Sequence, residues 1–334
     1  MTEMRGKVYV VGAGPGDPGL ITLKGKECIE QADVVVYDYL AAPALLGYAG
    51  EDAELIYVGK KGGDHTLTQD GINALLVEKA NEGLVVARLK GGDPFIFGRG
   101  GEEVEVLIDA GIAFEVVPGV TSAVAAPAYA GIPLTHRKFT STVAFVTGHE
   151  DPQKESSNID WHALASGIGT LVFFMGVKNL KHITARLMQH GMVPEKPVAL
   201  VGWGTTPRQR TVTGTLGTIN AEAENAGMKP PALIVIGDVV GLRERMKWFE
   251  KRPLLGKQIV VTRARKQASG FLKMLSAAGA ECLECPTIDV VPPPSWNALD
   301  KSINSLSDYD SVSYTHLTLP TIILPCRSRW SPYH

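Results

Sequence analysis

The sequence predicts an α/β protein with two successive domains, followed by an incomplete third α/β segment. Short apolar runs alternate with stretches of helical spacing, and the runs end repeatedly in glycine-containing turns. The length of 334 residues suits two domains or slightly more. In such folds ligands bind outside the carboxyl ends of the strands, so we look for a site in these turns.

The first domain, residues 1–135, is predicted from five apolar runs and the helices between them. Residues 69–81 place Ile72, Leu76 and Ala80 on one helical face, which is typical of a helix that covers a sheet. Thr121 or Ser122 can cap the last helix, or its hydroxyl can bond a ligand. The strands are expected at 7–11, 34–38, 55–58, 84–89 and 114–117, and the helices at 22–32, 69–81, from 104 onward and up to 130.

A second domain, residues 136–252, is expected because residues 133–140 break the pattern and a new alternation follows. Its strands are expected at 142–147, 170–174, 198–201 and 233–236. Glycine-containing turns follow again, with Met175 after one strand and Gly204 after another. A cleft between two such domains is the natural place for a ligand.

The most distinctive turn is the stretch RLKGGDPFIFGRGGEE, residues 88–103, between a strand and a helix. Its glycines permit positive φ angles and close approach of a ligand, although a tight bend alone would explain them as well. The turn at residues 12–18 is similar, but Pro15 and Asp17 interrupt the G-x-G-x-x-G spacing of a dinucleotide site. A nucleotide-dependent oxidoreductase is therefore the weaker interpretation.

Two charged residues, Asp38 and Lys60, each follow a strand of the first domain. Because the carboxyl ends of adjacent parallel strands meet at one edge of a sheet, these side chains can lie together in the ligand crevice. The alternative is that Asp38 caps the next segment and that Lys60 is solvated.

Composition excludes several classes of function. The net charge of −2 gives no global basic field for nucleic acid or an anionic membrane. We expect no membrane span and a cytoplasmic location, since no apolar run is long enough and no charged-then-apolar leader precedes residue 7. The four cysteines lack the partners of a zinc or redox site, so no metal is expected.

Several motifs, in order over residues 5–250, resemble the uroporphyrinogen-III C-methyltransferases, which are tetrapyrrole methylases that use S-adenosylmethionine (SAM). The matching stretches are GAGPGDP (12–18), YD (37–38), GK (59–60), residues 88–103, PGVTS (118–122), AYAGIPLTHR (128–137) and PALIVIG (231–237). The resemblance implies that Asp38 is a proton acceptor and Lys60 a proton donor. The SAM contacts that it implies are Pro15, Gly91, Gly92, Asp93, Ile96, Thr121, Ser122, Met175 and Gly204.

The implied reaction is methylation of uroporphyrinogen III at C2 and C7 by a homodimer, giving precorrin-2 and S-adenosylhomocysteine (SAH). The substrate carries carboxylates, so the cleft needs cations. The alternatives are another precorrin methyltransferase of the same fold and a non-catalytic domain that binds SAM or a tetrapyrrole. Candidate substrate-binding residues in the turns are Arg99, Lys61, His65, Arg137, Lys138, Arg208 and Arg210.

The remaining residues divide into two parts. Residues 253–311 resemble the beginning of uroporphyrinogen-III synthase, but the match stops too early for synthase activity to be expected. Residues 312–334 have no periodicity and three prolines, so we expect a disordered, non-native tail. Nothing before Lys7 matches the dehydrogenase–chelatase module of some relatives, so neither oxidation of precorrin-2 nor iron insertion is expected.

Overall fold

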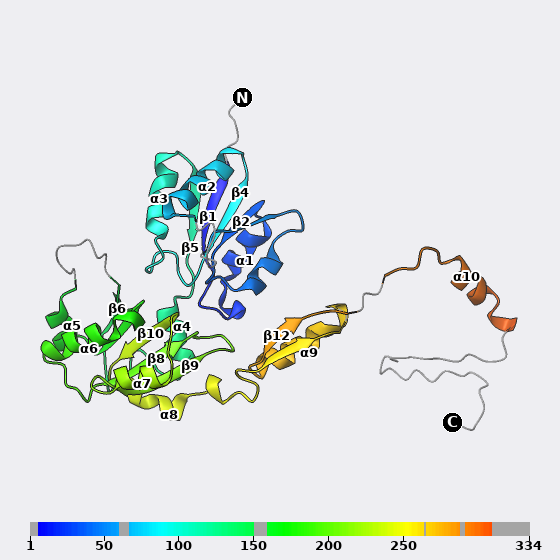
Figure 1. The fold of residues 1–334 in the computed structure, drawn as a ribbon. Helices are drawn as coiled ribbons and strands as arrows, with labels where there is room; N and C mark the ends of the chain where they lie inside the picture. Colours follow the sequence, from blue (N-terminus) through cyan, green and yellow to red (C-terminus); the bar gives the residue numbers. More distant parts are fainter. Residues whose placement is uncertain (1–5, 60–66, 150–158, 264, 288–290, 309–334) are drawn as a thin grey trace, which may run out of the picture.

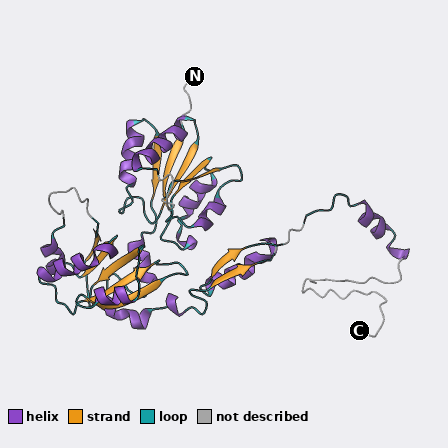
Figure 2. Cartoon of the chain, in the orientation of Figure 1, coloured by secondary structure: helices purple, strands orange, loops and turns teal. Residues whose placement is uncertain are grey.

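Two five-stranded sheets, one after the other along the chain, organise the protein in the computed structural model (Figure 1). The structure describes residues 6–59, 67–149, 159–263, 265–287 and 291–308. Helices cover both sheets (Figure 2), and a small third unit with a two-stranded sheet follows them. The predicted α/β class is therefore confirmed.

The first sheet is parallel throughout and has the order β3-β2-β4-β1-β5. Its central strands bury consecutive apolar residues; Val10 and Val11 in one strand, and Val34, Val35 and Val36 in another, are all fully buried or nearly so. Continuous apolar runs are typical of parallel strands that are covered on both faces. The strands are β1 (Lys7–Gly12), β2 (Val34–Tyr37), β3 (Glu54–Tyr57), β4 (Val85–Lys90) and β5 (Ala113–Val117).

Helices cover both faces of this sheet. Helix α1 (Leu23–Glu30) packs on one face together with the 3-10 helix η2 (Pro43–Tyr48). Helices α2 (Gln69–Asn81) and α3 (Gly100–Asp109) pack on the other. Helix α2 has the predicted bounds, because the Thr68 hydroxyl accepts a hydrogen bond from the Gly71 amide and so caps its first turn.

The second sheet is mixed and has the order β6-β7-β10-β8-β9. Strands β6 and β7 are parallel, whereas β10 is antiparallel to both of its neighbours, β7 and β8. The predicted strands are present, and β9, which the sequence did not suggest, forms the edge. The strands are β6 (Val143–Thr147), β7 (Thr170–Phe174), β8 (Pro197–Gly202), β9 (Arg210–Thr215) and β10 (Ala232–Ile236).

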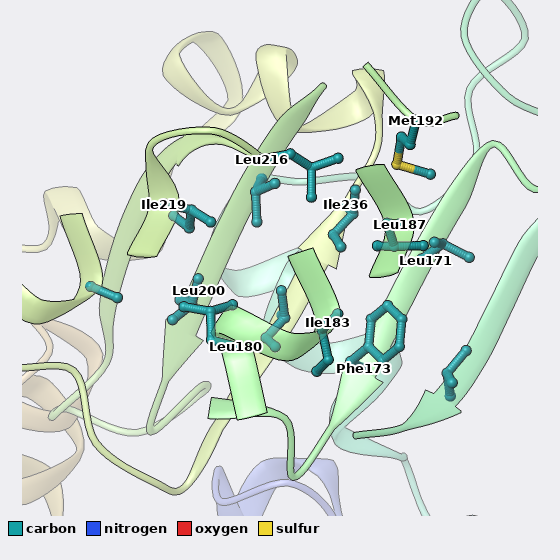
Figure 3. Close-up of a cluster of buried hydrophobic side chains, with 14 of the residues drawn as sticks. Leu171, Phe173, Leu180, Ile183, Leu187, Met192, Leu200, Leu216, Ile219 and Ile236 are labelled. Carbon is teal, nitrogen blue, oxygen red and sulfur yellow. The ribbon is translucent and has the colours of Figure 1, made fainter. Parts of the chain in front are cut away.

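One face of the second sheet packs under α5 (Trp161–Gly167), α6 (Leu180–Gln189) and α7 (Ile219–Asn225). Figure 3 shows this core, in which Phe173, Leu187 and Leu200 interdigitate between helices and strands.

The other face of the second sheet is covered by helix α4 (Ser122–Tyr129) and the 3-10 helix η4 (Asp238–Leu242). Helix α4 therefore already packs on the second sheet. The chain enters the second domain before residues 135/136, where the sequence predicts the boundary.

The third unit is a parallel strand–helix–strand unit that follows α8 (Arg243–Met246) and η5 (Phe249–Lys251). It contacts the second domain through the Gly256 amide, which donates to the Pro207 carbonyl at 3.0 Å. The predicted tail at 312–334 lies outside the described residues. The elements of the unit and beyond are β11 (Gln258–Val261), α9 (Arg265–Ala277), β12 (Glu281–Glu284), α10 (Asn297–Asn304) and η6 (Leu306–Asp308).

Candidate functional site

Three glycine-containing loops interlock at the carboxyl ends of the central strands of the first sheet. The amides and carbonyls of Gly14 and Gly92 exchange two hydrogen bonds, of 2.7 and 3.2 Å. The carboxylate of Asp93 accepts the Gly119 amide at 3.0 Å and the Phe95 amide at 2.9 Å. The loops that follow β1 and β4 are thus joined backbone to backbone, and the Asp93 side chain joins the loop after β4 to the loop after β5.

This close packing explains why Gly119 follows β5. A Cβ atom at that position would lie 2.3 Å from the Gly92 carbonyl oxygen and 2.6 Å from the Gly12 Cα atom. We expect Gly119→Ala to lower the free energy of unfolding by about 1–3 kcal/mol, since backbone atoms must move apart. Gly47→Ala is the matched control, because nothing lies within 4 Å of its added Cβ. Equal unfolding midpoints of the two variants in scanning calorimetry would contradict this account.

Loops of the second domain meet those of the first at the same place. The ring of Phe97, after β4, lies 4.9 Å from that of Phe174 at the end of β7. The ring of Tyr39, after β2, lies 5.9 Å from that of Trp203, after β8. The candidate site is therefore built from strand ends of both domains.

Backbone strain is concentrated in these loops. Positive φ angles at residues other than glycine are uncommon, and they gather at functional sites that the surrounding structure over-determines. Within the described part of the chain, such residues all follow β4, β7 or β8. They are Phe97 (53°), Arg99 (59°), Met175 (53°), Trp203 (49°) and Thr205 (70°).

A hollow of about 600 Å³ lies between the two sets of loops. Arg99 lines it, and its guanidinium makes two hydrogen bonds to the carboxylate of Glu102, of 2.8 and 2.6 Å. More than half of the Arg99 side chain is exposed, so it remains accessible to an anion. The first domain contributes Phe95, Phe97, Arg99, Gly100, Gly101 and Glu102, and the second Thr147, His149 and Met175.

Asp38 directly follows β2 at this end of the sheet and is held by a buried charge network. Its carboxylate accepts the Leu40 amide at 3.0 Å and the Arg88 guanidinium at 3.3 Å. Glu103 Oε1 lies 3.3 Å from Arg88 Nε and 2.6 Å from Lys90 Nζ, and all three of these side chains are at most 5% exposed. The network fixes one side of the Asp38 carboxylate, while the residue stays partly open to solvent.

Lys90 is an unusual member of this network. Burial, together with the positive charge of Arg88, lowers the pKa of its amine, and the contact with Glu103 acts in the opposite direction.

Sequence reasoning did not assign roles to Arg88, Lys90 and Glu103. The sequence did contain a signal for the two cations. Arg88 and Lys90 are two residues apart at the end of an apolar strand, so their side chains lie on the same face of the sheet.

The loops at these strand ends contain most residues of the predicted site. Thr121 caps α4, since its hydroxyl accepts the Ala123 amide at 3.4 Å. Ile96 and Met175 are exposed, and Gly204 packs so closely on α4 that an added Cβ would lie 2.3 Å from the Ala126 Cβ. The predicted residues in these loops are Pro15, Asp38, Gly91, Gly92, Asp93, Ile96, Arg99, Thr121, Ser122, Met175 and Gly204.

Two of the predicted cations lie elsewhere, and two make contacts with other parts of the chain. Arg137 and Lys138 precede β6, at the opposite end of the second sheet from Met175. The Arg208 guanidinium stacks 4.0 Å from the centre of the Trp203 ring and lies 3.9 Å from Glu281 of the third unit.

Arg210 donates to the Ala226 carbonyl at 3.1 Å, on the side of α7. The remaining predicted site residues, Lys60, Lys61 and His65, lie outside the described residues.

Among the described residues, no group of three or more His, Cys, Asp or Glu side chains could hold a metal ion. None of the helices in those ranges is both long and apolar enough to cross a membrane.

Comparison with known proteins gives consistent matches. Residues 7–220 match the family model of the tetrapyrrole (corrin/porphyrin) methylases. A uroporphyrinogen-III C-methyltransferase of Bacillus subtilis is 49% identical over 86% of this chain, and the chain spans 59% of that relative's length. An S-adenosyl-L-methionine-dependent uroporphyrinogen III methyltransferase of Methanosarcina barkeri is 56% identical over 73% of this chain and 96% of the relative.

A solved structure with the same fold contains a ligand. It is the uroporphyrin-III C-methyltransferase of Thermus thermophilus complexed with S-adenyl homocysteine. It superposes with a TM-score of 0.60 at 41% identity, covering 71% of this chain and all of the other.

Proposed function

Since the chain belongs to the tetrapyrrole methylases, we propose that it methylates uroporphyrinogen III at C2 and C7 with SAM, giving precorrin-2 through precorrin-1. The observation that carries the proposal is the meeting of the interlocked glycine loops with the loops after β7 and β8 of the second domain, beside a hollow that the loop after β4 lines. The relatives named for this activity match the chain across both domains.

Residues of these loops fit SAM. Ile96 and Met175 present exposed apolar side chains from opposite domains, which suits an adenosyl group. The glycines at 91 and 92 bring the main chain close to any ligand that lies on this loop. When bound, SAM supplies an electrophilic methyl group and leaves as SAH. The contacts we propose are Pro15, Gly91, Gly92, Asp93, Ile96, Thr121, Ser122, Met175 and Gly204.

Proton transfer is the chemical task of the chain itself. The ring carbon that accepts the methyl group carries no hydrogen, so the conjugated macrocycle must lose a proton from another position. Asp38, held by Arg88 and the Leu40 amide, is the proposed acceptor. Lys60 is the proposed donor. The larger part of the acceleration comes from alignment of the two reactants by the loops, an effect worth up to about 7–11 kcal/mol.

Arg99 is the proposed contact for a carboxylate of the macrocycle, because its exposed guanidinium lines the hollow. We expect Arg99→Ala to raise KM for uroporphyrinogen III by roughly 10- to 100-fold, as befits the loss of a charge-assisted hydrogen bond. The KM for SAM should stay within about twofold. Arg245→Ala, an exposed arginine on α8, is the control. An unchanged KM for uroporphyrinogen III would remove Arg99 from the site.

The proposal is tested by anaerobic incubation of the full chain with uroporphyrinogen III and SAM. Two methyl groups added to the mass of the macrocycle, with SAH formed in proportion, are the expected result. Binding of SAH without turnover would instead favour a sensor domain. Turnover with a later precorrin but not with uroporphyrinogen III would identify another methylase of the same fold.

Three finer features belong to the same proposal. The enzyme is a homodimer, which light scattering would reveal, and it works in the cytoplasm.

Residues 253–311 are an initial piece of a uroporphyrinogen-III synthase, in keeping with the parallel β11–α9–β12 unit. Measurable cyclisation of hydroxymethylbilane by the full chain would contradict this assignment.

A further inference from the structure

Asp17, at the end of the loop that follows β1, is held from several sides. Its amide donates to the Thr205 hydroxyl of the second domain at 3.0 Å. Its carboxylate accepts the Tyr129 hydroxyl at 2.7 Å and the Gly19 amide at 2.8 Å. The loop that contains Pro15 is therefore tied to α4 and to the loop after β8.

Thr205 reaches Asp17 only because a buried polar chain holds it in a strained conformation. Its φ of 70° is unusual for a β-branched residue, and it is 3% exposed. The Thr205 amide donates to Gln209 Oε1 at 2.8 Å, and Gln209 Nε2 donates to Glu250 at 3.0 Å. Glu250 in turn pairs with the buried Arg243. Strain that is maintained by this many partners indicates a functional constraint.

Tyr129 holds the same carboxylate from α4. Its ring packs 5.1 Å from that of Trp248 and 4.8 Å from that of Phe249. Burial, and then the hydrogen bond to Asp17, raise the pKa of the Tyr129 hydroxyl. The hydroxyl therefore remains a donor to Asp17 to a higher pH than a solvated tyrosine would.

We propose that Thr205 and Tyr129 form an interdomain latch on Asp17 that positions the Pro15 turn against Gly204 and so sets the affinity for the methyl donor. Both are positioning residues, since they act through Asp17 and not on the reacting atoms. The inference rests on the proposed function, in which Pro15 and Gly204 contact SAM. The latch serves donor binding and has no part in proton transfer at Asp38.

The first test compares Thr205→Val, which removes the acceptor, with Thr205→Ser, which keeps it. We expect Thr205→Val to raise the Kd for SAH in calorimetry and the KM for SAM by about fivefold to tenfold, as for the loss of one hydrogen bond, with kcat within twofold. Thr205→Ser should bind within twofold of the unsubstituted chain. Thr213→Val, at an exposed position of β9, is the matched control.

Tyr129→Phe provides an independent test, since it breaks the other half of the latch. The single variants should each weaken SAH binding, and the double variant should weaken it by less than the product of the two effects, because both act through Asp17. Binding by Thr205→Val and Tyr129→Phe equal to that of the unsubstituted chain would overturn the latch alone. Failure of the unsubstituted chain to bind SAH would overturn the proposed function and the latch together.

Discussion

Glu103→Ala is expected to lower the free energy of unfolding by about 3–5 kcal/mol, the usual cost of leaving buried charges without their partner. Glu103 is the carboxylate that faces both Arg88 and Lys90, at 3.3 and 2.6 Å. Its side chain is fully buried, so water cannot replace it. Urea denaturation of the variant and of the unsubstituted chain measures the difference.

The adjacent Glu102 provides the control, because both glutamates lie in the first turn of α3. Glu102 pairs with Arg99 at 2.6 Å, but its side chain is 50% exposed. Glu102→Ala should therefore cost at most about 1 kcal/mol. Similar losses for the two variants would mean that the buried network contributes no more than an exposed ion pair.

Asp38→Asn is expected to lower kcat for methylation by about 10²- to 10⁴-fold, the range that positioned acids and bases contribute. The amide keeps the shape of the side chain and can still accept the Leu40 amide, but it cannot accept a proton from the macrocycle. Binding of SAH should stay within about twofold. The initial rate of SAH formation under anaerobic conditions measures the effect.

Asp33→Asn is the matched control at the other end of the same strand. Asp33 precedes β2, and its carboxylate accepts the Val85 amide at 2.8 Å, far from the loops of the site. Its activity should stay close to that of the unsubstituted chain. If Asp38→Asn kept more than about a tenth of the activity, Asp38 would lose its proposed role.

The sequence predicted the first sheet well because its signals are local. Continuous apolar runs gave the strands, and the spacing of Ile72, Leu76 and Ala80 gave α2. The position of Asp38 at the end of β2, beside β3, followed from the rule for adjacent parallel strands, and the structure pairs these two strands in parallel.

The second sheet was harder to predict, because its pairing depends on contacts far apart in the sequence. Nothing local says that β10 enters between β7 and β8 and runs antiparallel to both. Arg208 lies in a loop, as predicted, but its guanidinium stacks on Trp203, whereas Arg210 begins β9. Predicting them as substrate contacts required their side-chain directions, which only the fold provides.

Parts of the site were also beyond sequence patterns. Positive φ angles are expected at glycine, so nothing suggested them at Met175 or Thr205. The pairing of Arg88 and Lys90 with Glu103 joins a strand to the helix that follows the loop, and charged residues near a turn are ordinarily solvated.

The central place of β10 also determines when the protein can be completed during synthesis. All strands of the first sheet have been made by Val117, so that domain can fold as the nascent chain leaves the ribosome. The second sheet must wait for Ala232–Ile236; until then β7 and β8 lack the strand that pairs with both of them, and α4 lacks part of the surface on which it packs. Nascent chains that stall before β10 are therefore the ones we expect chaperones to retain.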